Sequence, residues 1–295
     1  MNLGTKKNKS ACPRRRTLCA LAVFALGLAL AFYAGRELWR GMRDYAAAQD
    51  EYAYLRGLSA VIAAIPRAAP VPAVSEDIQS PPGETPPAQT TEQVYFEPLP
   101  YEDSTSEYLP SPPPPPPDPA QIAASLSVFS EINPDFMGWI IISGTSVDYP
   151  VVRGPDNTQY LNTTFSGASN PSGAIFMDYR CTGGFDAPVS LIHGHNMRDG
   201  SMFSPLTGFL NRDFMLRHSE IIIVTADGEI LVYRVFEARR TDAWDRVYTL
   251  DFNDAYAAAA FFGDEDSERF LILSTCLSGA DRDARLLVLA VLVKE

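Results

Sequence analysis

Eight short hydrophobic runs, separated by turn-forming residues, dominate the C-terminal part of the chain. Each is rich in branched aliphatic or aromatic side chains, as strands are. The runs are GWIIISG (138–144), VDYPVV (147–152), GAIFMD (173–178), APVSLIHGH (187–195), EIIIVTADG (220–228), EILVYRVFEARR (229–240), RFLILSTC (269–276) and RLLVLAVLV (285–293). The Asp-Gly pair at 227–228 predicts a tight hairpin between two of them. So many short strands predict a closed or nearly closed β-barrel.

Two other segments have helical character. QIAASLSVFSEI (121–132) has apolar residues spaced as in a short helix, and the alanine-rich FNDAYAAAAFF (252–262) predicts a helical insert before the seventh run. The barrel and these helices together form a mostly β domain over residues 120–295, which is long enough to bury a single core.

The N-terminal region has a different pattern. Residues 17–35 contain no charged side chain, and nineteen residues at about 1.5 Å each can cross the apolar part of a bilayer. Residues 1–16 carry six basic side chains and no acidic one, which predicts a cytoplasmic tail, a single transmembrane helix and an exported body. A cleaved signal peptide is the alternative, but its apolar region usually spans only about 7–15 residues.

Two further segments separate this predicted anchor from the barrel. Residues 36–65 have helix-forming composition and predict a juxtamembrane helical segment, continuous with the anchor or separate from it. Residues 66–119 hold 17 of the 24 prolines and predict a disordered, partly extended linker. At about 3.1 Å per residue it could act as a spacer of up to ~170 Å. A plain linker and a ligand for a proline-binding module are alternatives.

Charge and cysteine content exclude some classes of function. Outside residues 1–16 the chain has 18 basic against 36 acidic residues, so it lacks the clustered cations of a nucleic-acid surface. The four cysteines show no metal-ligand spacing and the acidic residues are dispersed, so we expect neither a metal nor another cofactor. A disulfide between Cys181 and Cys276 is a less favoured possibility.

The candidate chemistry lies where the seventh run meets a polar loop. Cys276 ends that run, and Arg285 begins the next run across the loop. Two of the three histidines, His193 and His195, lie where the fourth run enters a glycine-containing turn. A thiolate is a nucleophile, an imidazole can move its proton, and a guanidinium can stabilise an oxyanion, so the set predicts acyl transfer.

Each of these residues also has a structural interpretation. A cysteine in an apolar strand is usually a buried core residue. A histidine in a turn is often structural, and Arg285 could form an ion pair with Asp281 or Asp283.

Several segments resemble class B sortases. LSTC (273–276) followed by ARLLVLA is similar to their active-site strand pair, and GHNMRDGSMFSPL (194–206) to their histidine segment. The segments 132–167 and 173–180 resemble their opening strands. The resemblance implies an eight-stranded sortase barrel with an N-terminal helix and a helix in the loop before the cysteine strand.

The same resemblance implies residue roles. Cys276 matches the nucleophile, His195 the general acid/base and Arg285 the arginine that supports substrate and oxyanion. Thr275, beside the nucleophile, either binds substrate or only packs. His193 stands where class B members often have an aromatic residue, so it is the alternative histidine.

A class B sortase is a membrane-anchored cysteine transpeptidase of a Gram-positive surface. The resemblance implies cleavage of an LPxTG- or NPxTx-like sorting motif after Thr and transfer of the acyl group to an amine. The expected partners are surface proteins with a C-terminal sorting motif, an amine of peptidoglycan or a pilin subunit, and the membrane. A cysteine hydrolase and a catalytically inert, membrane-tethered scaffold are the rival hypotheses.

Overall fold

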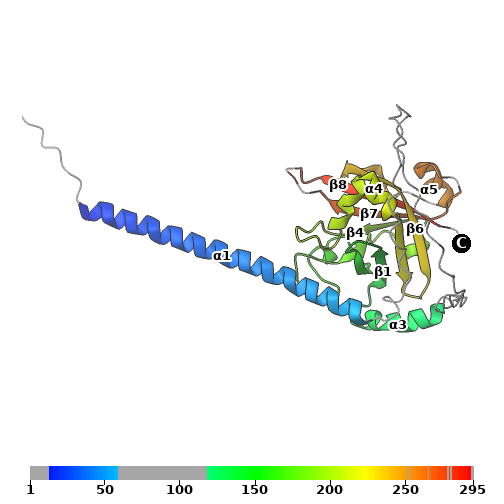
Figure 1. Ribbon diagram of the computed structural model, residues 1–295, viewed down its shortest axis with the longest axis horizontal. Coiled ribbons are helices and arrows are strands. Elements are labelled where there is room, and N and C mark those ends of the chain that lie inside the picture. The colour runs from blue at the N-terminus through cyan, green and yellow to red at the C-terminus, as the bar shows by residue number, and fades with distance from the viewer. Residues whose placement is uncertain are drawn as a thin grey trace, which may run out of the picture.

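The chain folds into a closed barrel of eight strands preceded by helices (Figure 1). The computed structural model describes residues 13–58 and 118–293, apart from 251, 253, 265, 278 and 280, with side chains from residue 21. The strands are β1 (Phe136–Ile142), β2 (Asp148–Val152), β3 (Ile175–Met177), β4 (Val189–His193), β5 (Glu220–Thr225), β6 (Ile230–Asp242), β7 (Phe270–Cys276) and β8 (Ala284–Leu292). Each lies largely within one of the eight predicted runs.

The strands close in the order β1-β2-β3-β4-β7-β8-β6-β5. The pairs β2–β3 and β4–β7 are parallel and the other pairs are antiparallel. The predicted hairpin is confirmed between β5 and β6, where Gly228 takes a positive φ of 92°. The parallel β4–β7 pair matters most for function, because it brings the histidine segment beside the cysteine strand.

The barrel core explains why β7 is continuously hydrophobic from Phe270 to Leu273. Every residue of β7 from Phe270 to Thr275 is buried, and only Cys276 at its end is exposed. A strand buried on both faces cannot alternate apolar and polar residues. The run therefore ends in polar sequence where the strand reaches the barrel rim.

Short helices cover the outside of the barrel. Helix α3 (Pro119–Ile132) begins at the N-cap Asp118 and buries Ile122, Leu126 and Phe129, and α5 (Ala255–Phe262) begins at the N-cap Asp254. Both were predicted. Helix α4 (Arg212–Arg217) and the 3₁₀ helices η1 (Gln159–Leu161), η2 (Gly184–Asp186), η3 (Ser204–Leu210) and η4 (Arg246–Thr249) were not, because they are too short to show a helical period.

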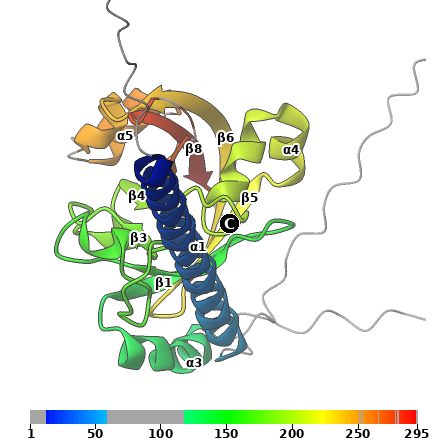
Figure 2. The same cartoon turned by 90° about the vertical axis from the view of Figure 1, so that its left-hand side faces the viewer.

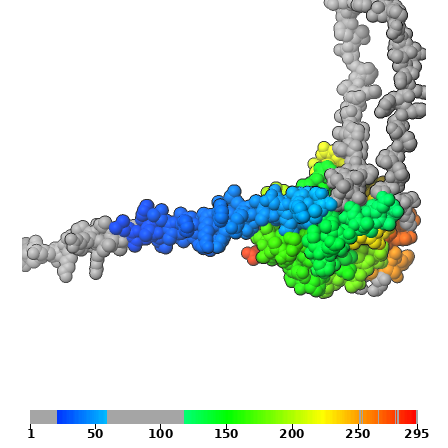
Figure 3. All heavy atoms as spheres, turned by 90° about the horizontal axis from the view of Figure 1, so that it is seen from below, coloured from blue at the N-terminus to red at the C-terminus, as the bar shows by residue number. Residues whose placement is uncertain are grey.

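The N-terminal helix α1 (Pro13–Leu58) is continuous from the apolar stretch into the predicted juxtamembrane segment. It is long and apolar enough to cross a membrane, and its large apolar side chains between Leu21 and Tyr33 are exposed. Its C-terminal part packs on the barrel through Ala48, Tyr52 and Leu55, which are at most 3 % exposed. Figure 3 shows this part lying against the barrel while the N-terminal part projects away.

The predicted proline-rich linker falls mostly outside the described part of the chain. Of its residues, 66–119, the structure describes only the last two positions. The helices on its two sides, α1 and α3, both pack on the barrel, and they lie close to one another (Figure 2). The apolar stretch of α1 is therefore joined to the barrel by the packed C-terminal part of the same helix.

Candidate active site

A pocket of about 290 Å³ opens at the barrel rim where β4, β7 and β8 come together. All three predicted site residues line it: Cys276, His195 and Arg285. Thr275, which was predicted either to bind substrate or only to pack, and the alternative histidine, His193, also line the pocket. The remaining lining residues are Asn157, Leu161, Phe176, Asp178, Arg180, Gly194, Ala243, Tyr248 and Ser274.

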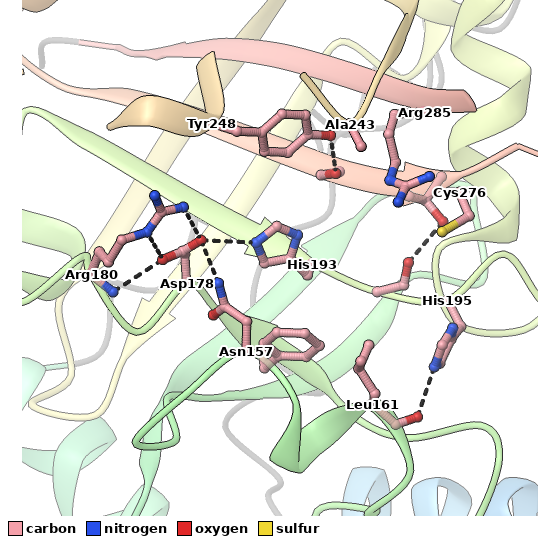
Figure 4. A pocket seen from close by; sticks show the side chains of 14 residues that line it. Asn157, Leu161, Asp178, Arg180, His193, His195, Ala243, Tyr248, Cys276 and Arg285 are labelled. Atoms are coloured by element: carbon pink, nitrogen blue, oxygen red, sulfur yellow. Dashed lines mark hydrogen bonds and ion pairs between the residues drawn. The ribbon is translucent and has the colours of Figure 1, made fainter. Parts of the chain in front are cut away.

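Cys276 and Arg285 are direct partners across the β7–β8 pair. Directly opposed residues in an antiparallel pair place their Cβ atoms about 5 Å apart on the same face of the sheet. The Cys276 thiol is free and exposed. In Figure 4 Cys276 lies between Arg285 and His195. The register of one hairpin therefore brings the sulfur and the guanidinium together.

The Arg285 guanidinium is held by its own loop. Nη1 donates hydrogen bonds to the carbonyl oxygens of Arg282 and Ala284, at 2.9 and 3.1 Å. The expected alternative, an ion pair with Asp281 or Asp283, does not form. Among the described residues both hydrogen bonds of this side chain use one nitrogen, which leaves Nε and Nη2 of the guanidinium to donate to a substrate oxygen.

His195 is oriented by the backbone of η1. Its Nε2 lies 2.8 Å from the carbonyl oxygen of Leu161. A carbonyl can only accept a hydrogen bond, so Nε2 carries a hydrogen and Nδ1 is the nitrogen that can gain or lose a proton. Among the described residues no hydrogen bond joins this ring to Cys276, so a proton would pass between His195 and the substrate rather than along a preformed pair.

Two polar residues connect strand β7 to the histidine loop (residues 194–203). The Thr275 hydroxyl donates to the carbonyl oxygen of Gly194 at 2.7 Å, and Asn196 Nδ2 donates to the carbonyl oxygen of Cys276 at 3.0 Å. Thr275 is only 2 % exposed. Its hydroxyl hydrogen is committed to the loop, which favours a positioning role over direct binding of substrate.

His193 belongs to a separate cluster at the other end of the pocket. Its Nε2 lies 3.3 Å from Oδ2 of Asp178, and its ring stacks on Tyr248 with an interplanar angle of 11°. Asp178 also accepts hydrogen bonds from Arg180 and from the side chain of Asn157. The two histidines are thus only two residues apart, yet they have different partners, because β4 ends at His193.

The charge of this cluster is fixed by its hydrogen bonds. Burial alone would raise the pKa of Asp178, but the hydrogen bonds from Arg180, His193 and Asn157 lower it well below its ordinary value. Burial raises the pKa of Tyr248, although its hydrogen bond with Ser274 and the charge of Arg285 oppose the shift. At neutral pH the pocket therefore holds an ionised Asp178 and a neutral Tyr248 phenol.

Sequence reasoning missed four of the lining residues that make up this cluster. Asp178 is the last residue of the third run and Arg180 follows it, an Asp-x-Arg pattern that is consistent with a local ion pair. Asn157 and Tyr248 lie in a loop and in η4, and nothing in their local sequence connects them to the pocket.

The two cysteines of the barrel are not bridged. Cys181 and Cys276 are both free thiols, and Cys181 is buried. Burial raises the pKa of the Cys181 thiol to about 11, so it stays protonated. The disulfide considered from the sequence does not form, and Cys276 is the thiol that faces the pocket.

Comparisons with known proteins show which family this barrel and its pocket resemble. The family model of the sortase domain matches residues 140–293. Sortase B of Listeria monocytogenes is 29 % identical over 170 residues, 53 % of this chain and 68 % of that protein. Sortase B of Staphylococcus aureus is 30 % identical over 180 residues, 56 % of this chain and 72 % of that protein.

Solved structures of sortase B are also similar to this chain in fold. The Staphylococcus aureus sortase B–substrate complex has a TM-score of 0.52 and 28 % identity, covering 59 % of this chain and 86 % of that one. Sortase B of Clostridium perfringens has a TM-score of 0.52 and 27 % identity, covering 57 % and 99 %.

The barrel, the strand-end thiol and these matches define a cysteine transpeptidase. The chain belongs to the sortase family, and its relatives and structural neighbours place it in the class B branch. The predicted fold and class of enzyme are therefore confirmed, and the inert-scaffold hypothesis is not supported.

Proposed function

We propose that this transpeptidase cleaves an LPxTG- or NPxTx-like sorting motif after Thr and transfers the acyl group to an amine of peptidoglycan or of a pilin subunit. The observation that carries the proposal is the direct pairing of Cys276 with Arg285 at the mouth of a pocket that His195 also lines. We assign Cys276 as the nucleophile, Arg285 as the oxyanion and substrate support, and His195 as the general acid/base.

The first half-reaction forms a thioester. The Cys276 thiolate attacks the carbonyl carbon of the motif Thr, and the Arg285 guanidinium stabilises the negative charge that develops on the oxygen. The carbon–nitrogen bond then breaks as protonated His195 gives its Nδ1 proton to the departing amine. Hydrogen bonding of Nε2–H to Leu161 supports this assignment, because it keeps Nδ1 available for the transfer.

The second half-reaction regenerates the enzyme. An incoming amine attacks the thioester carbonyl and gives a proton to neutral His195, and the new amide forms as the Cys276 thiolate leaves. Water in place of the amine would give simple hydrolysis. The two reactions share the same first product, so only the second step distinguishes a transpeptidase from a hydrolase with this substrate.

The proposed location is the cell membrane of a Gram-positive bacterium, with the N-terminus in the cytoplasm and the barrel outside. Support comes from the apolar, exposed part of α1 and from the basic residues that precede it. The proposed partners are surface proteins with a C-terminal sorting motif and the amine-bearing acceptor.

Product analysis tests this proposal. The full chain in detergent is incubated with a library of LPxTG- and NPxTx-type peptides, with and without a peptidoglycan cross-bridge peptide or a lysine peptide as the amine. We expect cleavage after Thr and a new amide to one of the amines. Cleavage at the same rate that yields only the free acid with every amine would favour the hydrolase hypothesis instead.

A further inference from the structure

The C-terminal part of α1 contacts both segments that hold His195. We call residues 44–58 the docked segment of α1. One of the two contacted segments is the histidine loop, residues 194–203, and the other runs from η1 to β3. These contacts join regions more than a hundred residues apart in the sequence.

The contact with the η1–β3 segment leads directly to the partner of His195. The Tyr52 hydroxyl is buried and donates to the carbonyl oxygen of Gly173 at 2.7 Å. Gly173 has a φ of +57° and lies so close to η1 that a Cβ there would collide with the carbonyl oxygens of Tyr160 and Leu161. The Leu161 oxygen is the atom that binds Nε2 of His195. Tyr52 is therefore separated from the His195 ring by Gly173 and Leu161 alone.

The contact with the histidine loop has two parts. The Tyr52 ring packs edge-on against Tyr149, with centroids 5.1 Å apart, and the Tyr149 hydroxyl accepts the backbone N–H of Met202 at 3.0 Å. Met202 pairs with Asn196 across the loop and has a positive φ of 55°, a conformation that must be held by its surroundings. Gln49 Nε2 also donates to Oδ2 of Asp199 in the same loop, at 2.9 Å.

We propose that Tyr52 is a positioning residue for His195, so that the anchor helix is part of the catalytic unit and not only a tether. The inference rests on the proposed role of His195. Because α1 is continuous, the helix that would lie in the membrane also fixes the imidazole. A barrel cut away from α1, such as residues 120–295, would lose this support.

Three single variants of the full chain in detergent test the proposal: Tyr52→Ala, Tyr52→Phe and the control Tyr54→Ala. Tyr54 lies on the same helix and is 65 % exposed. Displacement of a catalytic group by about 1 Å can cost up to ~100-fold in rate, so we expect Tyr52→Ala to lower kcat by about ten-fold or more. KM should change little, because the other lining residues of the pocket are untouched.

Tyr52→Phe keeps the ring packing and loses only the hydrogen bond, so its kcat should lie between those of the wild type and Tyr52→Ala. The unfolding midpoint of each variant is measured in parallel. Equal kcat in Tyr52→Ala and Tyr54→Ala would overturn the proposal, and so would a loss of kcat no larger than the loss of folded protein. A wild-type chain inactive on every sorting peptide would instead contradict the proposed function.

Discussion

The two ends of the pocket differ in how tightly their side chains are held. At the Asp178 end a fully buried carboxylate is bonded to Arg180, His193 and Asn157. The His193 ring also stacks on Tyr248 and packs at a tilt against Phe176. At the Cys276 end the thiol is exposed, and the side chains of Arg285 and His195 are hydrogen-bonded to backbone carbonyls alone within the described part of the chain.

The difference matches what each end has to do. A backbone carbonyl carries no charge and does not titrate, so it can orient a side chain that is proposed to change charge or bonding during the reaction. Backbone carbonyls orient Arg285 and His195 without neutralising them. The side chains of the Asp178 cluster are not proposed to react, and their hydrogen-bond network makes this wall of the pocket rigid. The following predictions test this division, beginning with the largest effect.

Cys276→Ala should abolish turnover of a sorting peptide, because no other described thiol faces the pocket. The matched variant is Cys181→Ala, which removes the buried thiol and should leave kcat unchanged, at a cost in stability of about 1 kcal/mol. A fluorogenic sorting peptide measures both rates. Residual turnover in Cys276→Ala above the background without enzyme would contradict the assignment of the nucleophile.

The two histidines should respond differently to the same substitution. His195→Asn should lower kcat by about 10²–10⁴-fold, the usual contribution of a general acid or base. His193→Asn should act mainly on KM, because His193 lies in the wall of the pocket. Steady-state kinetics on both variants give the answer, and a larger loss of kcat in His193→Asn would reverse the two roles.

Arg285→Ala should lower kcat by about 10²–10³-fold, the scale for loss of an oxyanion donor. Arg285→Lys keeps the positive charge but lacks the planar guanidinium with its several N–H donors, so it should recover only part of the rate. Single-turnover acylation by a sorting peptide measures the affected step. Full activity in Arg285→Ala would exclude the guanidinium from the reaction.

Asp178→Asn should mainly affect stability, by about 2 kcal/mol at neutral pH, because it removes the carboxylate to which Arg180, His193 and Asn157 are hydrogen-bonded. The folded-state pKa of Asp178 is depressed, so its stabilisation is complete above its ordinary pKa of about 3.9 and is lost as pH falls through the folded value.

Urea unfolding of wild type and Asp178→Asn across pH provides the check. The difference in unfolding free energy should be constant from pH 7 to about pH 5 and shrink below about pH 4. A difference that stays constant down to pH 3 would show that the Asp178 carboxylate has an ordinary pKa.

Much of the barrel could be predicted because its strands are separate and strongly hydrophobic. β7 is buried from Phe270 to Thr275, so its sequence has only one interpretation, and the Asp-Gly turn at 227–228 fixed one hairpin. The pairing of Cys276 with Arg285 could also be predicted, since the two residues end and begin neighbouring strands.

The Asp178 cluster and the docked segment of α1 could not be predicted, because their contacts join distant parts of the chain. Tyr248 reaches the pocket from a four-residue 3₁₀ helix, and Tyr52 reaches Gly173 across 121 positions. No pattern in the nearby sequence indicates such a contact. For the same reason no sequence pattern indicated that the helices on both sides of the proline-rich segment pack on one barrel.

Mapping the acyl group on the enzyme tests the central claim most directly. The full chain is mixed with a cleavable sorting peptide, without an amine, quenched in acid, digested and examined by mass spectrometry. The account predicts that the peptide containing Cys276 gains the mass of the acyl fragment ending in Thr, and that hydroxylamine removes it. An adduct on another residue, or one that persists in Cys276→Ala, would contradict the account.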